Sequence, residues 1–76
     1  MRFQVFLTSF DQIKSFVALA MRQPFDIQVG NDRQCINGKD FMGMCTLDFS
    51  RPVEVQANCT AKEGAEFGKK LLAFQH

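Results

Sequence analysis

Apolar and polar residues alternate along several segments of the chain, and this pattern predicts β-strands with one buried face. The residues Gly30-Asn31-Asp32 favour a tight turn between the second and third of these segments, which predicts a hairpin. The predicted strands are residues 2–8, 25–29, 34–37 and 52–59.

A helical pattern follows the first predicted strand. Ser9 and Gln12 have the spacing of a capping box, in which the serine oxygen accepts from the third amide and the glutamine side chain reaches back. Pro24 should end this helix, because the residue before a proline is pushed out of helical geometry. The predicted apolar stripe consists of Ile13, Phe16, Val17, Ala20 and Met21.

Two further helices are predicted. Residues 39–45 form a short helix with Asp40 as its N-cap, and residues 62–74 form the last helix. Glycines inside a helix cost about 1 kcal/mol each relative to alanine, so Gly64 and Gly68 indicate a helix that lies close to the sheet. The residues expected on its buried face are Gly64, Phe67, Leu71 and Phe74.

These elements predict one domain over residues 1–76, in the order βαββ(α)βα. Two amphipathic helices and four half-buried strands are best accommodated as an α+β open-faced two-layer sandwich. In it, helices cover one face of a four-stranded antiparallel sheet. Nine phenylalanines without tryptophan or tyrosine supply a core that needs no buried hydrogen-bond partners.

The charge balance excludes several classes of partner. Nine basic and eight acidic residues give a net charge of +1, so we expect no nucleic-acid binding. No apolar stretch approaches the ~20 residues that span a bilayer, and the first residues resemble a strand rather than a signal peptide. We therefore expect a cytoplasmic protein without membrane association, monomeric or weakly homo-oligomeric.

The three cysteines, Cys35, Cys45 and Cys59, lie in no C-x-x-C motif and cannot all pair within one chain. A disulfide scaffold or a metal site is therefore not expected, and no cofactor is indicated. We expect these cysteines to be small buried or half-buried apolar residues in a reducing compartment. The alternative is a reactive thiol, for which Cys45 is the candidate because its segment could be exposed.

The element order and two local motifs resemble HPr, the small phosphocarrier of the bacterial phosphoenolpyruvate-dependent sugar phosphotransferase system. The segment Phe16-Val17, Ala20, Asp26-Ile27-x-Val29 is similar to the family's first helix and second strand. The segment 39–47 is similar to its Lys-Ser-apolar-Met-Gly-apolar-Met-Ser-Leu motif. Both motifs fall in one ungapped register, and the resemblance in element order and length covers nearly the whole chain.

Members of that family carry phosphate on a histidine in a His-x-Arg-Pro motif at the start of the first helix. The shared register places Ser9 at the histidine, Asp11 at the arginine and Gln12 at the proline. Aligning from the first strand instead places Gln12 at the histidine and Lys14 at the arginine, so neither register supplies a histidine. His76 is the last residue, where we expect a frayed end rather than a catalytic group.

The alternative function, from a different functional class, is that of a phosphocarrier that uses an unconventional phosphate acceptor, Ser9 or His76. A serine needs a base to become nucleophilic, and Asp11 would repel a phosphoryl donor, so we interpret Ser9 as a plain N-cap. A small-anion site at this helix N-terminus is disfavoured by Asp11 but stays open.

The resemblance also implies a regulatory serine at the start of the short helix, and Asp40 occupies that position. Aspartate could imitate a phosphoserine permanently, although it carries about one charge where phosphoserine carries nearly two. The simpler interpretation is an ordinary N-cap.

The resemblance further implies a partner-binding patch on the short helix. Its candidate residues are Phe41, Met42, Met44 and Cys45, although a core role is equally open for each. We therefore expect a non-catalytic, regulatory HPr-like module that binds a protein partner from the phosphotransferase system or from carbon catabolite control.

Overall fold

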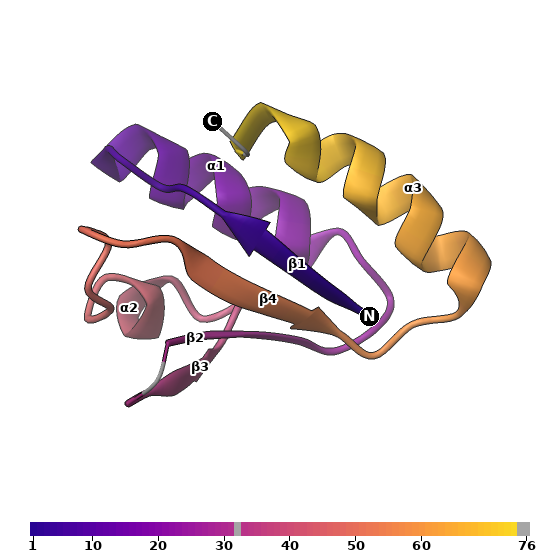
Figure 1. Cartoon of the computed structure of the whole chain (residues 1–76), viewed down its shortest axis with the longest axis horizontal. Coiled ribbons are helices and arrows are strands. Elements are labelled where there is room, and N and C mark those ends of the chain that lie inside the picture. The colour runs from indigo at the N-terminus through magenta and orange to yellow at the C-terminus, as the bar shows by residue number, and fades with distance from the viewer. Residues whose placement is uncertain (32, 75–76) are drawn as a thin grey trace.

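The computed structural model describes residues 1–31 and 33–74 as four strands and three α-helices. Two layers are visible in Figure 1, where α1 and α3 lie side by side over one face of the sheet. The elements are β1 Arg2–Val5, α1 Phe10–Met21, β2 Ile27–Gly30, β3 Cys35–Asn37, α2 Phe41–Met44, β4 Val53–Ala57 and α3 Ala61–Leu71, followed by a 3-10 turn, Leu72–Phe74.

The sheet is fully antiparallel, with the strand order β1-β4-β2-β3. One row across it joins Phe3, Val55, Val29 and Ile36 and faces the helices. Because side chains alternate between the two faces, the adjacent row, which includes Gln28, is exposed. The fold class and element order predicted from the sequence are confirmed.

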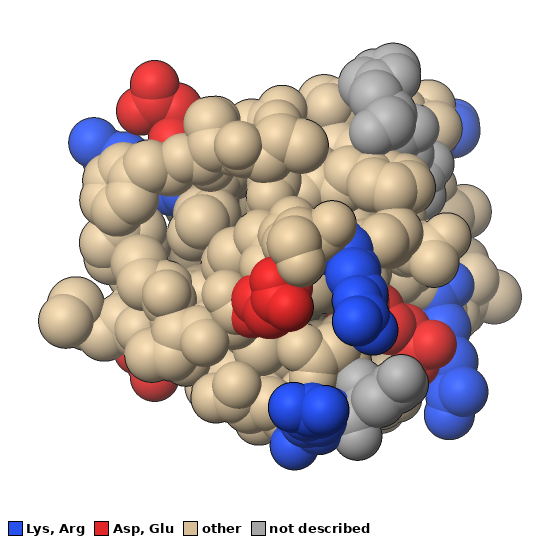
Figure 2. All heavy atoms as spheres, turned by 60° about the vertical axis from the view of Figure 1, so that its left-hand side comes forward, with Lys and Arg blue, Asp and Glu red and all other residues tan. Residues whose placement is uncertain are grey.

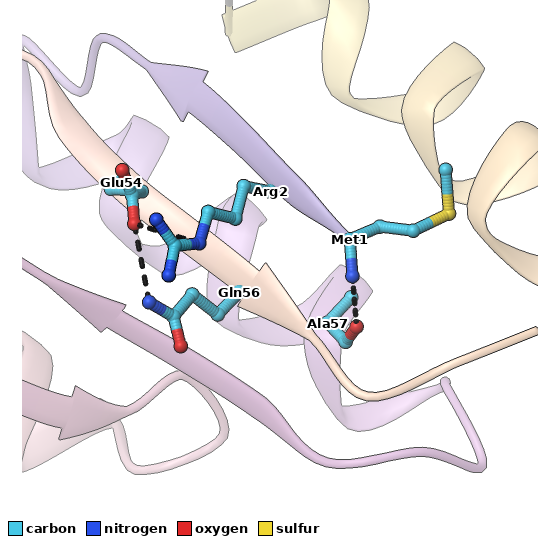
Figure 3. A network of polar contacts seen from close by, with 5 residues as sticks. All are labelled: Met1, Arg2, Glu54, Gln56 and Ala57. Atoms are coloured by element: carbon cyan, nitrogen blue, oxygen red, sulfur yellow. Dashed lines mark hydrogen bonds and ion pairs between the residues drawn. The ribbon is translucent and has the colours of Figure 1, made fainter.

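The face without helices is polar. Figure 3 shows its residues Arg2, Glu54 and Gln56, where Arg2 Nε lies 3.7 Å from Glu54 Oε1 and Gln56 Nε2 donates to the same oxygen at 3.2 Å. At the end of this row, the Met1 nitrogen donates to the Ala57 carbonyl at 2.8 Å, which extends the pairing of β1 with β4. Glu54 therefore links two other polar side chains of this face, Arg2 and Gln56.

Helix α3 lies close to β1, as its glycines predicted. A Cβ at Gly68 would stand 3.0 Å from the Phe3 ring, and a Cβ at Gly64 would collide with the Met1 sulfur. Phe67 meets the Phe3 ring edge to face, with 5.8 Å between centroids. All four residues predicted for the buried face of this helix are buried: Gly64, Phe67, Leu71 and Phe74.

Several local predictions need correction. Met21, the last residue of α1, is 65% exposed and does not belong to the buried stripe, whereas its neighbour Ala20 is buried as predicted. The last helix begins at Ala61 rather than at residue 62, and its N-cap Thr60 forms a complete capping box with Glu63 that the spacing Thr-x-x-Glu signals but the prediction lacked. In the predicted turn, Asn31 Oδ1 accepts from the backbone of Arg33 and Gln34, and Asp32 lies outside the described residues.

Candidate functional site

The start of α1 is the position at which the resemblance places a phosphate-carrying histidine. Ser9 is the N-cap, and its Oγ accepts from the Gln12 amide at 3.2 Å. Gln12 Oε1 accepts from the Thr8 amide at 2.6 Å and from the Thr8 hydroxyl at 2.9 Å. The predicted capping box is therefore only half formed, because the glutamine bonds to Thr8 rather than to the Ser9 backbone.

Asp11 is exposed in the first turn of α1. Its carboxylate is favourable for the helix, because the N-terminus carries a partial positive charge. The same negative charge opposes an incoming anion. Ser9, Asp11 and Gln12 lie together at the start of α1, where their side chains have capping and electrostatic roles. Their assignment to a degenerate phosphocarrier site stays a prediction.

Phe10 lies between these polar residues, 61% exposed, and sequence reasoning missed it. Its ring meets the Phe41 ring edge to face, with centroids 5.5 Å apart, and this contact joins the start of α1 to α2. Met42 on α2 is 76% exposed. We call Phe10, Phe41 and Met42 the apolar end surface.

The predicted patch on α2 divides between surface and core. Phe41 is half-buried, and Met42 and Cys45 are exposed. Met44 is fully buried at 0% exposure, so its assignment to a binding patch is wrong. The physical reason is that Met44 lies on the face of α2 that packs into the main hydrophobic core.

Asp40 is the N-cap residue of α2, with extended backbone angles, but its carboxylate makes no capping hydrogen bond. A Cβ at Gly43 would stand 2.7 Å from Asp40 Oδ2 and 2.8 Å from Ile36 Cγ2, so the glycine admits the carboxylate beside the helix. The predicted N-cap position is confirmed, whereas the predicted side-chain cap is not formed. Its role as a phosphoserine mimic stays a prediction.

Two of the three cysteines differ from the expectation that they are buried or half-buried, and Cys59 agrees with it. Cys35 and Cys45 are exposed, Cys59 is half-buried, and all three thiols are free. Cys35 Sγ donates to Gln28 Oε1 at 3.3 Å on the open sheet face. Within residues 1–31 and 33–74, no cluster of three potential metal ligands occurs.

Figure 2 turns the left-hand side of Figure 1 forward and shows acidic and basic groups, several of them side by side, on a surface that is otherwise uncharged. No described helix is long and apolar enough to cross a bilayer. His76 lies outside the described residues, so its geometry does not enter the site.

The strand order, the two covering helices and the short α2 together define an HPr-like fold. The crystal structure of HPr-C-His from Thermoanaerobacter tengcongensis has the same fold, with a TM-score of 0.75. The superposition covers 96% of this chain and 88% of that chain, at 22% sequence identity. No protein-family model matches the sequence, and no curated protein matches it.

Proposed function

We propose that this chain is a non-catalytic HPr-like module that binds a protein partner and does not carry phosphate on a histidine. The observation that carries the proposal is the composition of the start of α1. There Ser9 serves as a helix cap, Gln12 is bonded to Thr8, and the exposed neighbour is Phe10. This arrangement is better suited to bind an apolar surface of a partner protein than to transfer a phosphoryl group.

Ser9 is poorly placed to act as a nucleophile. A serine needs a general base within hydrogen-bond reach, as in Ser-His pairs. Ser9 Oγ instead accepts from the Gln12 amide, and Asp11 adds a negative charge to the same helix turn. A phosphoserine would also lack the transfer potential of a phosphohistidine.

In this proposal, the partner protein binds to the apolar end surface. Phe10 and Met42 are exposed by 61% and 76%, and Phe41, the residue before Met42, contacts the Phe10 ring. Exposed methionine and phenylalanine adapt to varied apolar partners. We propose a cytoplasmic partner from the phosphotransferase system or its transcriptional control, since HPr-like folds are known from that system.

The experiment is a binding assay with purified candidates from the same genome: the general phosphoryl donor enzyme and a carbon-control transcription regulator. The test variant is Phe10→Ala with Met42→Ala. The matched control is Met21→Ala with Leu72→Ala, which removes apolar side chains that are 65% and 59% exposed elsewhere on the molecule.

We expect the test variant to weaken binding at least about tenfold, because a central apolar contact contributes more than about 1.4 kcal/mol. The control should bind as the parent chain does. Equal affinity of the test variant and the parent chain, or absence of binding to either candidate, would contradict the proposal.

A further inference from the structure

Helix α2 and the turn that leads into it contact α1 at two places. On α2, the Phe41 ring meets the Phe10 ring at the start of α1, with 5.5 Å between centroids. In the turn before α2, the half-buried Lys39 donates from Nζ to the Gln23 backbone carbonyl at 2.9 Å. Gln23 directly follows the C-cap of α1 and lies 16 positions before Lys39 in the chain. The second contact therefore joins the end of α1 to the segment that leads into the apolar end surface.

We propose that Lys39 is a positioning residue for the apolar end surface: its bond to the Gln23 carbonyl sets the placement of α1 relative to α2, so that Phe41 meets Phe10. This inference rests on the proposed function, because it concerns the surface to which the partner protein binds. Phe41 and Met42 are the first two residues of α2, and Lys39 stands two residues before Phe41. A shift between the Lys39 turn and α1 would therefore separate the residues that form this surface.

The end of α1 is a favourable place for a cation, because the C-terminal end of a helix carries a partial negative charge. Among residues 10–21, all of which the structure describes, the last turn contains no basic residue. The C-cap residue, Arg22, is exposed. Lys39 brings an ammonium group to this end of the helix from another segment, and a hydrogen bond from a charged donor is stronger than one between neutral groups. Charge as well as geometry therefore stabilises the contact.

The turn that carries Lys39 is itself bonded to the sheet. Asn37 Oδ1 accepts from the Lys39 amide at 3.0 Å, and the Asn37 carbonyl accepts from the Asp40 amide at 2.9 Å. The Gly38 amide donates to the Ile27 carbonyl at 2.8 Å, which connects the turn to the start of β2. Because the turn is fixed to the sheet and leads directly into α2, the Lys39 side chain holds the end of α1 at a set position relative to both.

Other contacts keep α2 folded. Met44 is fully buried in the core, and its amide donates to the Asp40 carbonyl at 2.9 Å. The Cys45 amide donates to the Phe41 carbonyl at 3.1 Å. These contacts do not involve the Lys39 side chain, so a change at Lys39 should alter the placement of the two helices without unfolding α2.

The test compares Lys39→Met with Lys39→Arg in the isotope-labelled full chain. Methionine keeps an unbranched apolar side chain and removes the ammonium group, whereas arginine keeps a charged donor. We expect Lys39→Met to lose the nuclear Overhauser effects between the Phe10 and Phe41 rings, and Lys39→Arg to retain them. Lys39→Gln, which also removes the charge, repeats the comparison with a polar side chain. The matched control is Lys62→Met, which removes an exposed lysine in the first turn of α3 and should leave the ring contact intact.

The same variants are then titrated with whichever of the two candidate partners binds the parent chain. Lys39→Met should bind about three- to tenfold more weakly, and Lys39→Arg and Lys62→Met should stay within about twofold of the parent chain. Ring contacts that persist in Lys39→Met, an unchanged affinity of that variant, or equal effects of Lys62→Met would overturn the inference and leave the proposed function standing. If neither candidate binds the parent chain, the proposed function fails, and the ring contacts alone decide whether Lys39 places Phe41 against Phe10.

Discussion

The two methionines of α2 occupy opposite environments two residues apart. Met44 is fully buried in the core, whereas Met42 is 76% exposed and follows Phe41, whose ring contacts Phe10. One face of the short helix therefore holds the fold together, and the other face contributes to the apolar end surface. The difference separates residues whose loss should unfold the chain from residues whose loss should affect only binding.

The largest effect should come from Met44→Ala. The substitution leaves a cavity in a core that a 76-residue chain cannot easily refill, and it should lower the free energy of unfolding by about 2–5 kcal/mol. Urea denaturation followed by circular dichroism measures this loss. A loss below about 1 kcal/mol would mean that Met44 is not part of the core.

Phe41→Ala should have an intermediate effect, because the side chain is half-buried and its ring meets Phe10. We expect a loss of about 1–2 kcal/mol from the aromatic pair and the partial burial. The double variant Phe10→Ala with Phe41→Ala should then be less destabilised than the sum of the two single variants. Strict additivity in this thermodynamic cycle would show that the rings do not interact.

Ser9→Ala tests whether Ser9 contributes to stability rather than to binding. Loss of the bond from the Gln12 amide should cost about 1 kcal/mol of stability and leave partner affinity unchanged. Thermal unfolding and the binding assay described above measure the two effects. Unchanged stability together with weakened binding would place Ser9 in the interface instead.

Met42→Ala should have the smallest effect on stability, within about 0.5 kcal/mol, because the side chain is largely in solvent. Met21→Ala is the matched control, since that methionine is also exposed. Both variants should unfold at the same urea concentration as the parent chain. A clear destabilisation by Met42→Ala alone would mean that α2 depends on this side chain and that its two faces are not distinct.

Much of the fold could be predicted from the sequence, because the decisive signals are long and periodic. The alternation in β4 and the spacing of Phe67 and Leu71 each repeat over several residues, and both elements form at the predicted places with shorter regular spans, 53–57 and 61–71. Gly68 was also informative, because a Cβ at this position would stand only 3.0 Å from the Phe3 ring, which favours glycine where the helix approaches the sheet.

The site could be predicted only in part, because its signals are short or depend on distant contacts. A four-residue helix has too few positions to show which of Met42 and Met44 faces the core. Gln12 could bond to either Ser9 or Thr8, and spacing does not distinguish these partners. The bond from Lys39 to the Gln23 carbonyl joins two separate segments, so no local sequence pattern predicts it.

The measurement that tests the central claim most directly is a phosphotransfer assay on the full chain. The protein is incubated with phosphoenolpyruvate, magnesium and the general phosphoryl donor enzyme, with a histidine-containing HPr as the positive control, and is analysed by intact-mass spectrometry under neutral and acidic conditions. We predict that the control gains an acid-labile phosphate and that this chain gains none. Stoichiometric phosphate on His76 or Ser9 would contradict the account and make the chain a phosphocarrier.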